Sequence, residues 1–193
     1  MAESNPISTP AFSFSVENYH KMADAGILKS TDRVELIEGK ILTMSPMKSA
    51  HAACVDRLGD ILRHNIPYKV NIRQEKAITL GTHSEPEPDI AIVKFREDYY
   101  ETAHPKANDI LLLIEVSLSI QKYDRETKLP LYASHDIPEV WIVDLKDKVI
   151  EVYQKPIKNT YETKAIFSTD EKLTSSVVQP LAVKRVIRVK RNL

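Results

Sequence analysis

Two acidic residues, Asp89 and Glu115, each lie at one end of an apolar run in this sequence. Asp89 opens the run that continues through Ile90–Val93, and Glu115 nearly closes the run that begins at Ile110. Continuous Ile, Leu and Val residues without alternation are typical of strands covered on both faces. A carboxylate there needs a cation, because an isolated buried charge is too costly. If the two strands are neighbours, Asp89 and Glu115 can bind one divalent metal, as in a metal-dependent phosphodiesterase.

A basic side chain near such a pair would complete the site, and Lys122 and Lys128 follow Glu115 closely in the sequence. Each of these residues also has a simpler interpretation. Lys128 could be a surface lysine that pairs with Asp124, four residues earlier. Asp89 could be an aspartate in a Pro-Asp turn, and Glu115 an edge glutamate paired with an arginine. The two acidic residues together favour the metal site.

Three other residues are weaker candidates. Glu35 is either a third carboxylate of the site or a solvent-facing residue of a hairpin. His51 either reaches the site from a helix or is a core histidine bonded to a backbone carbonyl. Gln74, on a strand expected beside Asp89, is the least supported of the three.

The elements that must position these residues follow from periodicity and turn signals. Ser49 to Asn65 is the clearest helix, because its apolar residues recur at spacings of three and four, with His51 at the leading end of the buried face. Gly39 favours a hairpin turn. We also expect a helix ending near Gly26, hairpin strands at 34–37 and 41–44, strands at 68–80, 87–93, 109–116, 140–144 and 149–153, a helical segment at 123–135, and two or three edge strands in 161–193. This order predicts an α/β fold, with one mixed sheet covered by helices on both faces.

The 193 residues suffice for one domain with a sizeable core. We expect a loose arm at 1–12 and a single domain at 13–193. The longest apolar run, Ile110–Ile114, is far too short to span a membrane, and Met1–Pro10 lacks the pattern of a signal peptide. A single cysteine excludes an internal disulfide and fits a reducing compartment, so we expect a cytoplasmic protein.

Formal net charge is zero, with 27 basic and 27 acidic residues, which counts mildly against nucleic-acid binding. The last ten residues, 184–193, hold five basic residues and no acidic ones. We interpret them as a terminal strand with its charges on the solvent side.

Several motifs together resemble the Uma-type family of endonucleases, which is assigned to the PD-(D/E)XK restriction-endonuclease-like superfamily. The resemblance spans about residues 12–155 and keeps the order and spacing of the motifs. The matching segments are Arg33-Val34-Glu35-Leu36-Ile37-Glu38-Gly39, Pro88-Asp89, Glu115-Val116-Ser117, Asp124-x3-Lys128-x3-Tyr132 and Ile137-Pro138-Glu139-Val140-Trp141-Ile142-Val143-Asp144.

The resemblance implies a restriction-endonuclease-like mixed β-sheet flanked by helices and a Mg²⁺ (or Mn²⁺) dependent nuclease. In this interpretation Asp89 and Glu115 ligate the metal, and the backbone carbonyl of Val116 is the candidate third ligand, since Mg²⁺ prefers hard oxygen donors. The expected partner is nucleic acid, with DNA as the substrate, and a homodimer would suit cleavage of two strands.

The sequence departs from the superfamily pattern at the basic residue. That pattern places a lysine two positions after the second acid, where this chain has Ser117. The Uma-type pattern instead has a lysine in the following helix, which matches Lys128, although Pro130 should bend that helix. Lys128 is therefore our first choice and Lys122 our second. The alternatives to an endonuclease are an inactive nucleic-acid-binding or protein-interaction module on the same fold and, less favoured, another hydrolase with paired carboxylates.

Overall fold

The computed structural model describes residues 11–29, 31–118 and 123–188. Its centre is a six-stranded sheet with the strand order β3-β4-β5-β6-β7-β8. Only β5 and β6 run parallel within this sheet, so the chain between them must cross over one face. The strands are β3 (Val70–Gln74), β4 (Ile90–Lys94), β5 (Ile110–Ser117), β6 (Glu139–Asp144), β7 (Val149–Ile157) and β8 (Thr160–Ser168).

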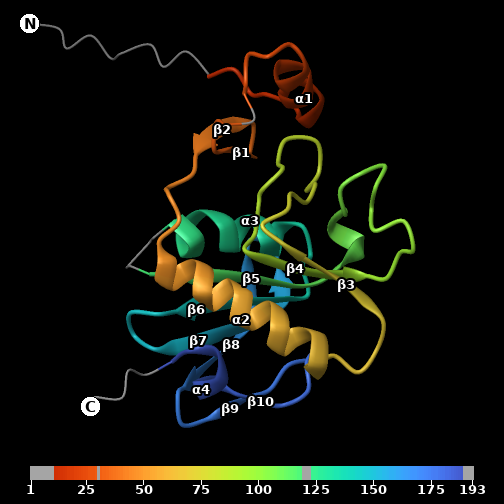
Figure 1. Ribbon diagram of the computed structural model, residues 1–193. Helices are drawn as coiled ribbons and strands as arrows, with labels where there is room; N and C mark the ends of the chain where they lie inside the picture. The colour runs from red at the N-terminus through yellow and green to blue at the C-terminus, as the bar shows by residue number, and fades with distance from the viewer. Residues whose placement is uncertain (1–10, 30, 119–122, 189–193) are drawn as a thin grey trace, which may run out of the picture.

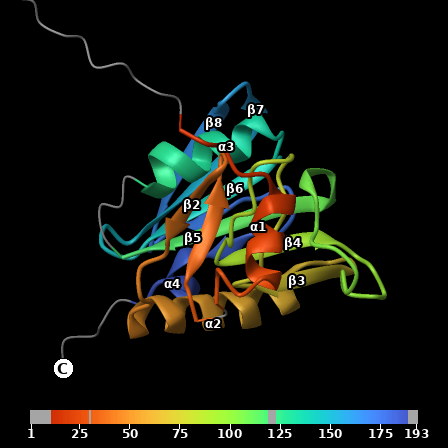
Figure 2. The same cartoon turned by 90° about the horizontal axis from the view of Figure 1, so that it is seen from above.

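Helices cover both faces of this sheet, as Figures 1 and 2 show. One face packs against α2 (Ser49–Asn65) and the short α4 (Val183–Val186). The other face packs against α3 (Leu129–Ser134), which belongs to the crossover from β5 to β6. Alternate residues of the buried strands enter the two cores, so that Ile114 faces α2 while Leu113 faces α3. The expected α/β fold with one mixed sheet is confirmed.

Smaller elements surround the sheet. A hairpin of β1 (Val34–Ile37) and β2 (Lys40–Thr43) stands over the end of the sheet together with α1 (Val16–Asp24). Ser15 begins α1 by accepting a hydrogen bond from the Asn18 backbone. The remaining elements are η1 (Ala107–Asp109), β9 (Lys172–Leu173) and β10 (Leu181–Ala182). None of the helices in the described ranges is long and apolar enough to cross a membrane.

The local predictions succeed where a periodic pattern or a turn signal is strong. The helix expected at 49–65 has those bounds, and the hairpin turns at Gly39 with φ of +76°. The strand expected at 68–80 is wrong beyond Gln74, because Glu75 adopts φ of +52° and the chain leaves the sheet. Ile78 and Leu80 are still buried, in the core on the α3 side of the sheet, which also contains Ile37 of the hairpin.

The prediction for the C-terminal segment was also wrong. Instead of starting a solvated terminal strand, Lys184 lies within α4, which places Val183, Val186 and Ile187 in the core beside α2. An apolar residue recurring every three to four positions favours a helical turn over a strand. The basic residues 190 and 191 lie outside the described part of the chain.

The helical segment before β6 begins with one π-helical turn, η2 (Asp124–Lys128), which continues directly into α3. The Leu129 N–H bonds to the Asp124 carbonyl, five residues earlier. Pro130 follows, and because it has no N–H it cannot donate a backbone hydrogen bond within the helix. The expected distortion of this helix is therefore present as a wide turn that buries both Asp124 and Lys128.

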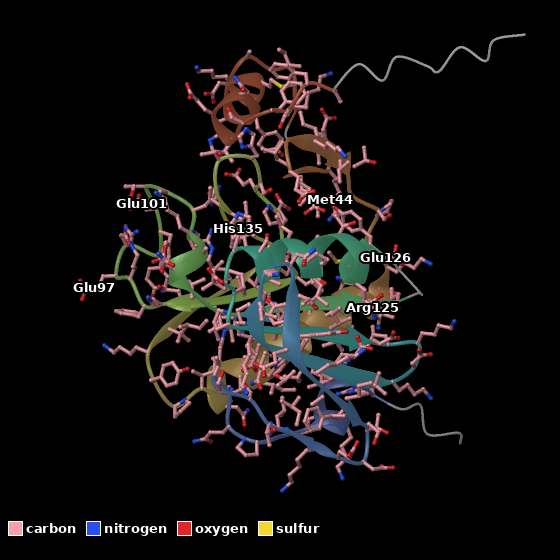
Figure 3. The ribbon with its side chains drawn as sticks, turned by 180° about the vertical axis from the view of Figure 1, so that it is seen from behind. Met44, Glu97, Glu101, Arg125, Glu126 and His135 are labelled. Atoms are coloured by element: carbon pink, nitrogen blue, oxygen red, sulfur yellow. The ribbon has the colours of Figure 1, made fainter. Side chains whose placement is uncertain are left out.

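Arg125, labelled in Figure 3, anchors η2 to the sheet through two ion pairs. Its Nη2 donates to Asp144 Oδ2 at 2.9 Å and its Nε to Glu151 Oε2 at 3.0 Å. Glu151 also accepts from Tyr153 at 2.7 Å and from Lys164 at 3.1 Å. Side chains of β6 and β7 thus hold η2 in place against the sheet.

We predict that Glu151→Gln destabilises the protein by about 1–2 kcal/mol at pH 7, because the charged hydrogen bonds to Arg125 and Lys164 are lost. Burial alone would raise the pKa of Glu151, but hydrogen bonds from Arg125, Tyr153 and Lys164 outweigh it and lower the pKa. A lowered pKa in the folded state stabilises the protein above the unfolded value of 4.5, and this contribution is lost as the pH falls through the folded pKa. Urea denaturation should therefore show a gap between variant and wild type that narrows below about pH 4.5.

The matched control is Glu162→Gln on the exposed side of β8, which should change the free energy of unfolding by less than about 0.5 kcal/mol. A gap for Glu151→Gln that stays constant as the pH falls from 7 to about 3 would contradict this account of the cluster.

Candidate active site

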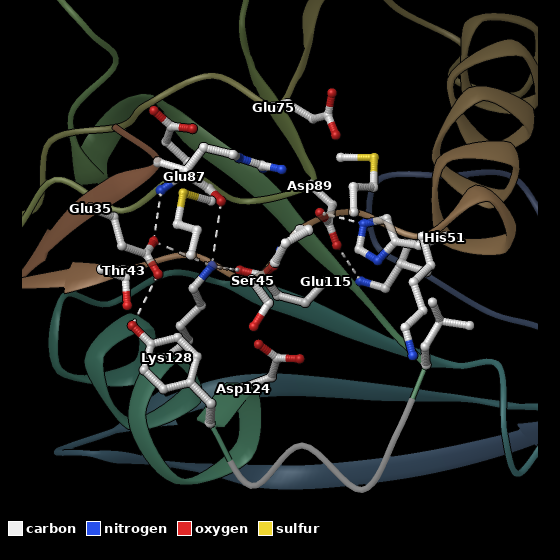
Figure 4. A pocket seen from close by; sticks show the side chains of 18 residues that line it. Glu35, Thr43, Ser45, His51, Glu75, Glu87, Asp89, Glu115, Asp124 and Lys128 are labelled. Carbon is white, nitrogen blue, oxygen red and sulfur yellow. Dashed lines mark hydrogen bonds and ion pairs between the residues drawn. The ribbon is translucent and has the colours of Figure 1, made fainter. Parts of the chain in front are cut away.

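A cavity of about 760 Å³ opens where β4 and β5 meet the hairpin, the start of α2 and the turn η2 (Figure 4). Its lining is unusually rich in charged side chains. Six carboxylates line it against three cations, so it carries an excess of negative charge if all are ionised. The carboxylates are Glu35, Glu75, Glu87, Asp89, Glu115 and Asp124, and the cations are Arg33, Lys48 and Lys128.

Asp89 lies directly before β4, and Glu115 lies on β5, the antiparallel neighbour of β4. Ile90 pairs with Ile114, so continuing this register by one residue beyond the start of β4 would bring Asp89 opposite Glu115. Residues directly opposite in an antiparallel pair project from the same face. The two strands are therefore neighbours, as the sequence analysis required, and both carboxylates line the cavity.

Asp89 is held by two partners from different elements. The Val116 N–H donates to Asp89 Oδ2 at 2.6 Å, and His51 Nε2 lies 2.8 Å from Asp89 Oδ1. The hydrogen bond to Asp89 is the largest cause that raises the pKa of His51, and burial opposes it. His51 thus reaches the site from the first turn of α2 rather than bonding to a backbone carbonyl. Gln74 does not line the cavity and instead contacts Arg63.

Lys128 is the central cation of the site. Its side chain is buried, and Nζ lies 3.3 Å from Glu115 Oε1 and 3.4 Å from Glu35 Oε2. Nζ also donates to the Glu87 carbonyl at 3.3 Å. Burial alone would lower the pKa of Lys128, but the charges of the surrounding carboxylates outweigh it and raise the pKa. Lys128 is therefore a buried, protonated ammonium group and not a surface lysine paired with Asp124.

The two carboxylates beside Lys128 have further partners. Glu35 is only 3% exposed and accepts from the Tyr123 hydroxyl at 3.0 Å and the Glu87 N–H at 3.1 Å, so it does not face solvent. Glu115 accepts from the Tyr132 hydroxyl at 2.5 Å. Burial raises the pKa of Glu115, and the charge of Lys128 opposes that rise.

The structure brings six of the eight sequence-predicted residues to this cavity: Glu35, His51, Asp89, Glu115, Val116 and Lys128. Lys122, the second choice of lysine, lies outside the described residues. Sequence reasoning assigned no role at the site to Tyr132 or to Asp124. The spacing of four that joins both residues to Lys128 was a usable signal, because residues four apart lie on one side of a helix.

The donor set suits a hard divalent cation. Two carboxylates and the Val116 carbonyl supply oxygen atoms, and the surplus of negative charge in the cavity favours cation binding. Within residues 11–29, 31–118 and 123–188, no three His, Cys, Asp or Glu side chains are arranged to hold a metal ion. An ion here would therefore depend on two carboxylates, a carbonyl and water, which is a set that Mg²⁺ accepts.

We predict that Lys128→Met destabilises the protein by about 3–5 kcal/mol, because it leaves Glu35 and Glu115 buried without their cation. Adding Glu35→Gln to this variant should recover part of the loss, since one of the two uncompensated charges is then removed. Urea denaturation of the wild type, the two single variants and the double variant measures this coupling. Strictly additive effects would show that Lys128 and Glu35 do not depend on each other.

Comparisons with known proteins identify the family and the fold. Residues 16–187 match the model of the Uma2 family, described as "putative restriction endonuclease". Among solved structures, a "putative nuclease belonging to DUF820" from Anabaena variabilis is similar, with a TM-score of 0.65 and 20% sequence identity over 90% of this chain and 97% of that chain. No curated protein matches. The Anabaena protein shares the fold of this chain. Because the family model covers residues 16–187 of the 193 residues, this chain belongs to the Uma2 family of restriction-endonuclease-like proteins.

Proposed function

We propose that this protein is a Mg²⁺-dependent endonuclease that hydrolyses phosphodiester bonds of DNA. The observation that carries the proposal is that the neighbouring strands β4 and β5 bring Asp89 and Glu115 to one cavity rich in carboxylates, with Lys128 Nζ 3.3 Å from Glu115. The family and the similar solved structure, both described as nucleases, support the reaction class. Mn²⁺ should replace Mg²⁺, since both suit carboxylate, carbonyl and water ligands.

In this proposal Asp89, Glu115 and the Val116 carbonyl hold the ion. When bound, Mg²⁺ supplies a coordinated water of lowered pKa and stabilises negative charge on the phosphate. The Val116 N–H and His51 fix the orientation of Asp89, so its carboxylate needs no rearrangement to serve as a ligand.

Lys128 supplies a fixed positive charge beside Glu115, one of the proposed metal ligands. Because neighbouring carboxylates raise its pKa, Nζ is protonated at neutral pH, which favours a role in contacting a phosphate oxygen over a role in removing a proton. A buried, preoriented ammonium group stabilises developing phosphate charge more strongly than one in water does. Glu35 and Tyr132 hold this arrangement in place through Lys128 and Glu115.

The rim of the cavity offers contacts for a polyanion. Arg33 and Lys48 line it and are exposed, and neither forms an ion pair within the described ranges. Phosphate groups on either side of the scissile bond could bind these side chains, as basic residues commonly bind nucleic-acid backbones. We further propose that the protein is a homodimer, which would present two such cavities. We also propose that it is located in the cytoplasm.

We predict that the purified protein nicks supercoiled plasmid in the presence of Mg²⁺ or Mn²⁺, and that Asp89→Asn and Glu115→Gln each reduce the nicking rate at least about 100-fold. The physical reason is the loss of an anionic oxygen ligand with little change in shape. Gel electrophoresis of plasmid over time measures the rate. Glu75→Gln is the matched control, because Glu75 is an exposed carboxylate of the same cavity, and it should cleave within about threefold of the wild type.

Nicking that persists in both Asp89→Asn and Glu115→Gln would reject this site. Binding of plasmid without cleavage under any divalent ion would favour the inactive binding module instead. Removing the ion with EDTA should stop nicking, and adding Mg²⁺ in excess should restore it.

We also predict that substitutions of the two candidate lysines differ in their effect on the nicking rate. Lys128→Ala should reduce the nicking rate far more than Lys122→Ala, by about 100-fold or more, because Lys128 supplies a preoriented charge at the site. Circular dichroism at the assay temperature must show that both variants are folded, since Lys128 also contributes to stability. Equal effects of the two substitutions in folded protein would remove Lys128 from the proposed mechanism.

A further inference from the structure

Asp124 is a buried acidic residue of the cavity for which the proposed function has no use so far. It is the first residue of η2 and only 8% exposed. Figure 4 shows its carboxylate pointing into the cavity below Glu115 and Lys128, with no dashed line to any neighbour. Throughout the described part of the chain, its carboxylate has no hydrogen bond or ion pair.

Glu35, Asp89 and Glu115 differ from Asp124 in this respect. Glu35 has three partners, Asp89 has two, and Glu115 has Lys128 and Tyr132. A buried carboxylate without a partner destabilises a fold, because nothing replaces the water that it loses. Burial is the largest cause and raises the pKa of Asp124; the charge of Lys128 lowers it, the charges of Asp89 and Glu35 raise it, and the net pKa is raised. An asparagine would suit the fold of the isolated protein better than this aspartate does.

The backbone nevertheless holds Asp124 in this place. Arg125, the next residue, is bound outside the cavity to Asp144 and Glu151, which fixes the start of the turn. The π-helical turn then places Asp124 and Lys128 together in the lining of the cavity. Isolated π-helical turns occur frequently at functional sites. Asp124 is thus directed at the cavity by the backbone, although its carboxylate is buried there.

We propose that Asp124 is a third acidic residue of the cation site, which accepts hydrogen bonds from water molecules that remain on the ion held by Asp89 and Glu115. This inference rests on the proposed function. It agrees with the observation that no three such side chains in the described ranges are arranged to hold a metal ion. Mg²⁺ gives up its water reluctantly and usually keeps several water molecules. A carboxylate that accepts hydrogen bonds from these water molecules needs no direct bond to the ion. The bound cation and its water would supply the partners that Asp124 lacks.

The test is metal binding by the full chain without nucleic acid. Isothermal titration with Mn²⁺, checked by the electron paramagnetic resonance signal of free Mn²⁺, should show that Asp124→Asn binds about 10–100-fold more weakly than the wild type. In metal-free buffer, the melting midpoint of Asp124→Asn should equal or exceed that of the wild type, because an unpartnered buried charge is gone. Glu126→Gln removes an exposed carboxylate two residues further along the same turn (Figure 3) and should leave the affinity within about twofold.

The outcomes separate this inference from the function on which it rests. If Asp89→Asn abolishes Mn²⁺ binding while Asp124→Asn binds as the wild type does, the role of Asp124 is overturned and the metal site stands. If the wild type binds no Mn²⁺, both proposals fall. Weaker binding by Asp124→Asn together with a melting midpoint lowered by more than about 4 °C would indicate structural damage and would also overturn the inference.

Discussion

A single buried ammonium group determines how the charged centre of this protein is arranged. Lys128 Nζ lies among oxygen atoms from the hairpin, from the segment before β4 and from β5, which are far apart in the sequence. Carboxylates such as Glu35 and Glu115 cannot share a water-poor space unless a cation offsets their repulsion. The hairpin therefore meets the sheet at this point through Lys128, and the cavity keeps its shape while carrying more carboxylates than cations.

The position of Lys128 depends in turn on interactions outside the cavity. Arg125 binds carboxylates of β6 and β7, and so holds one end of the turn against the sheet. At the other end, Leu131 and Tyr132 of α3 are buried in the core, and the Tyr132 hydroxyl reaches Glu115. The cavity side chains of η2 are therefore positioned partly by packing and ion pairs outside the cavity, and partly by the hydrogen bond from Tyr132 to Glu115, which lines the cavity.

The sequence predicts much of the sheet and of the site, for reasons that particular residues make clear. Asp89 and Glu115 could be placed because each adjoins an unbroken apolar run, and adjacent buried strands bring such ends together. The helix at Ser49–Asn65 could be bounded because its periodicity is strong. The end of β3 could not be predicted, since Glu75 turns the chain by a positive φ that glutamate rarely adopts.

The contacts of the charged side chains could not be predicted either. Spacing alone suggests that Lys128 pairs with Asp124, because residues four apart are neighbours on an ordinary helix. Lys128 instead pairs with Glu35, 93 positions earlier, and with Glu115. Such a choice depends on which carboxylates the tertiary fold buries nearby, and a local pattern contains no such information.

The serine at position 117 is consistent with a lysine that comes from the helix rather than from the strand. Ser117 pairs in register with Asp144 of β6, and paired residues of neighbouring strands project from the same face. Asp144 is also the residue to which Arg125 binds. A lysine at position 117 would bring a second cation beside Asp144, which already pairs with Arg125. We infer that the small serine and the arginine anchor belong together: Arg125 secures η2, and η2 delivers from Lys128 the ammonium group that the strand does not provide.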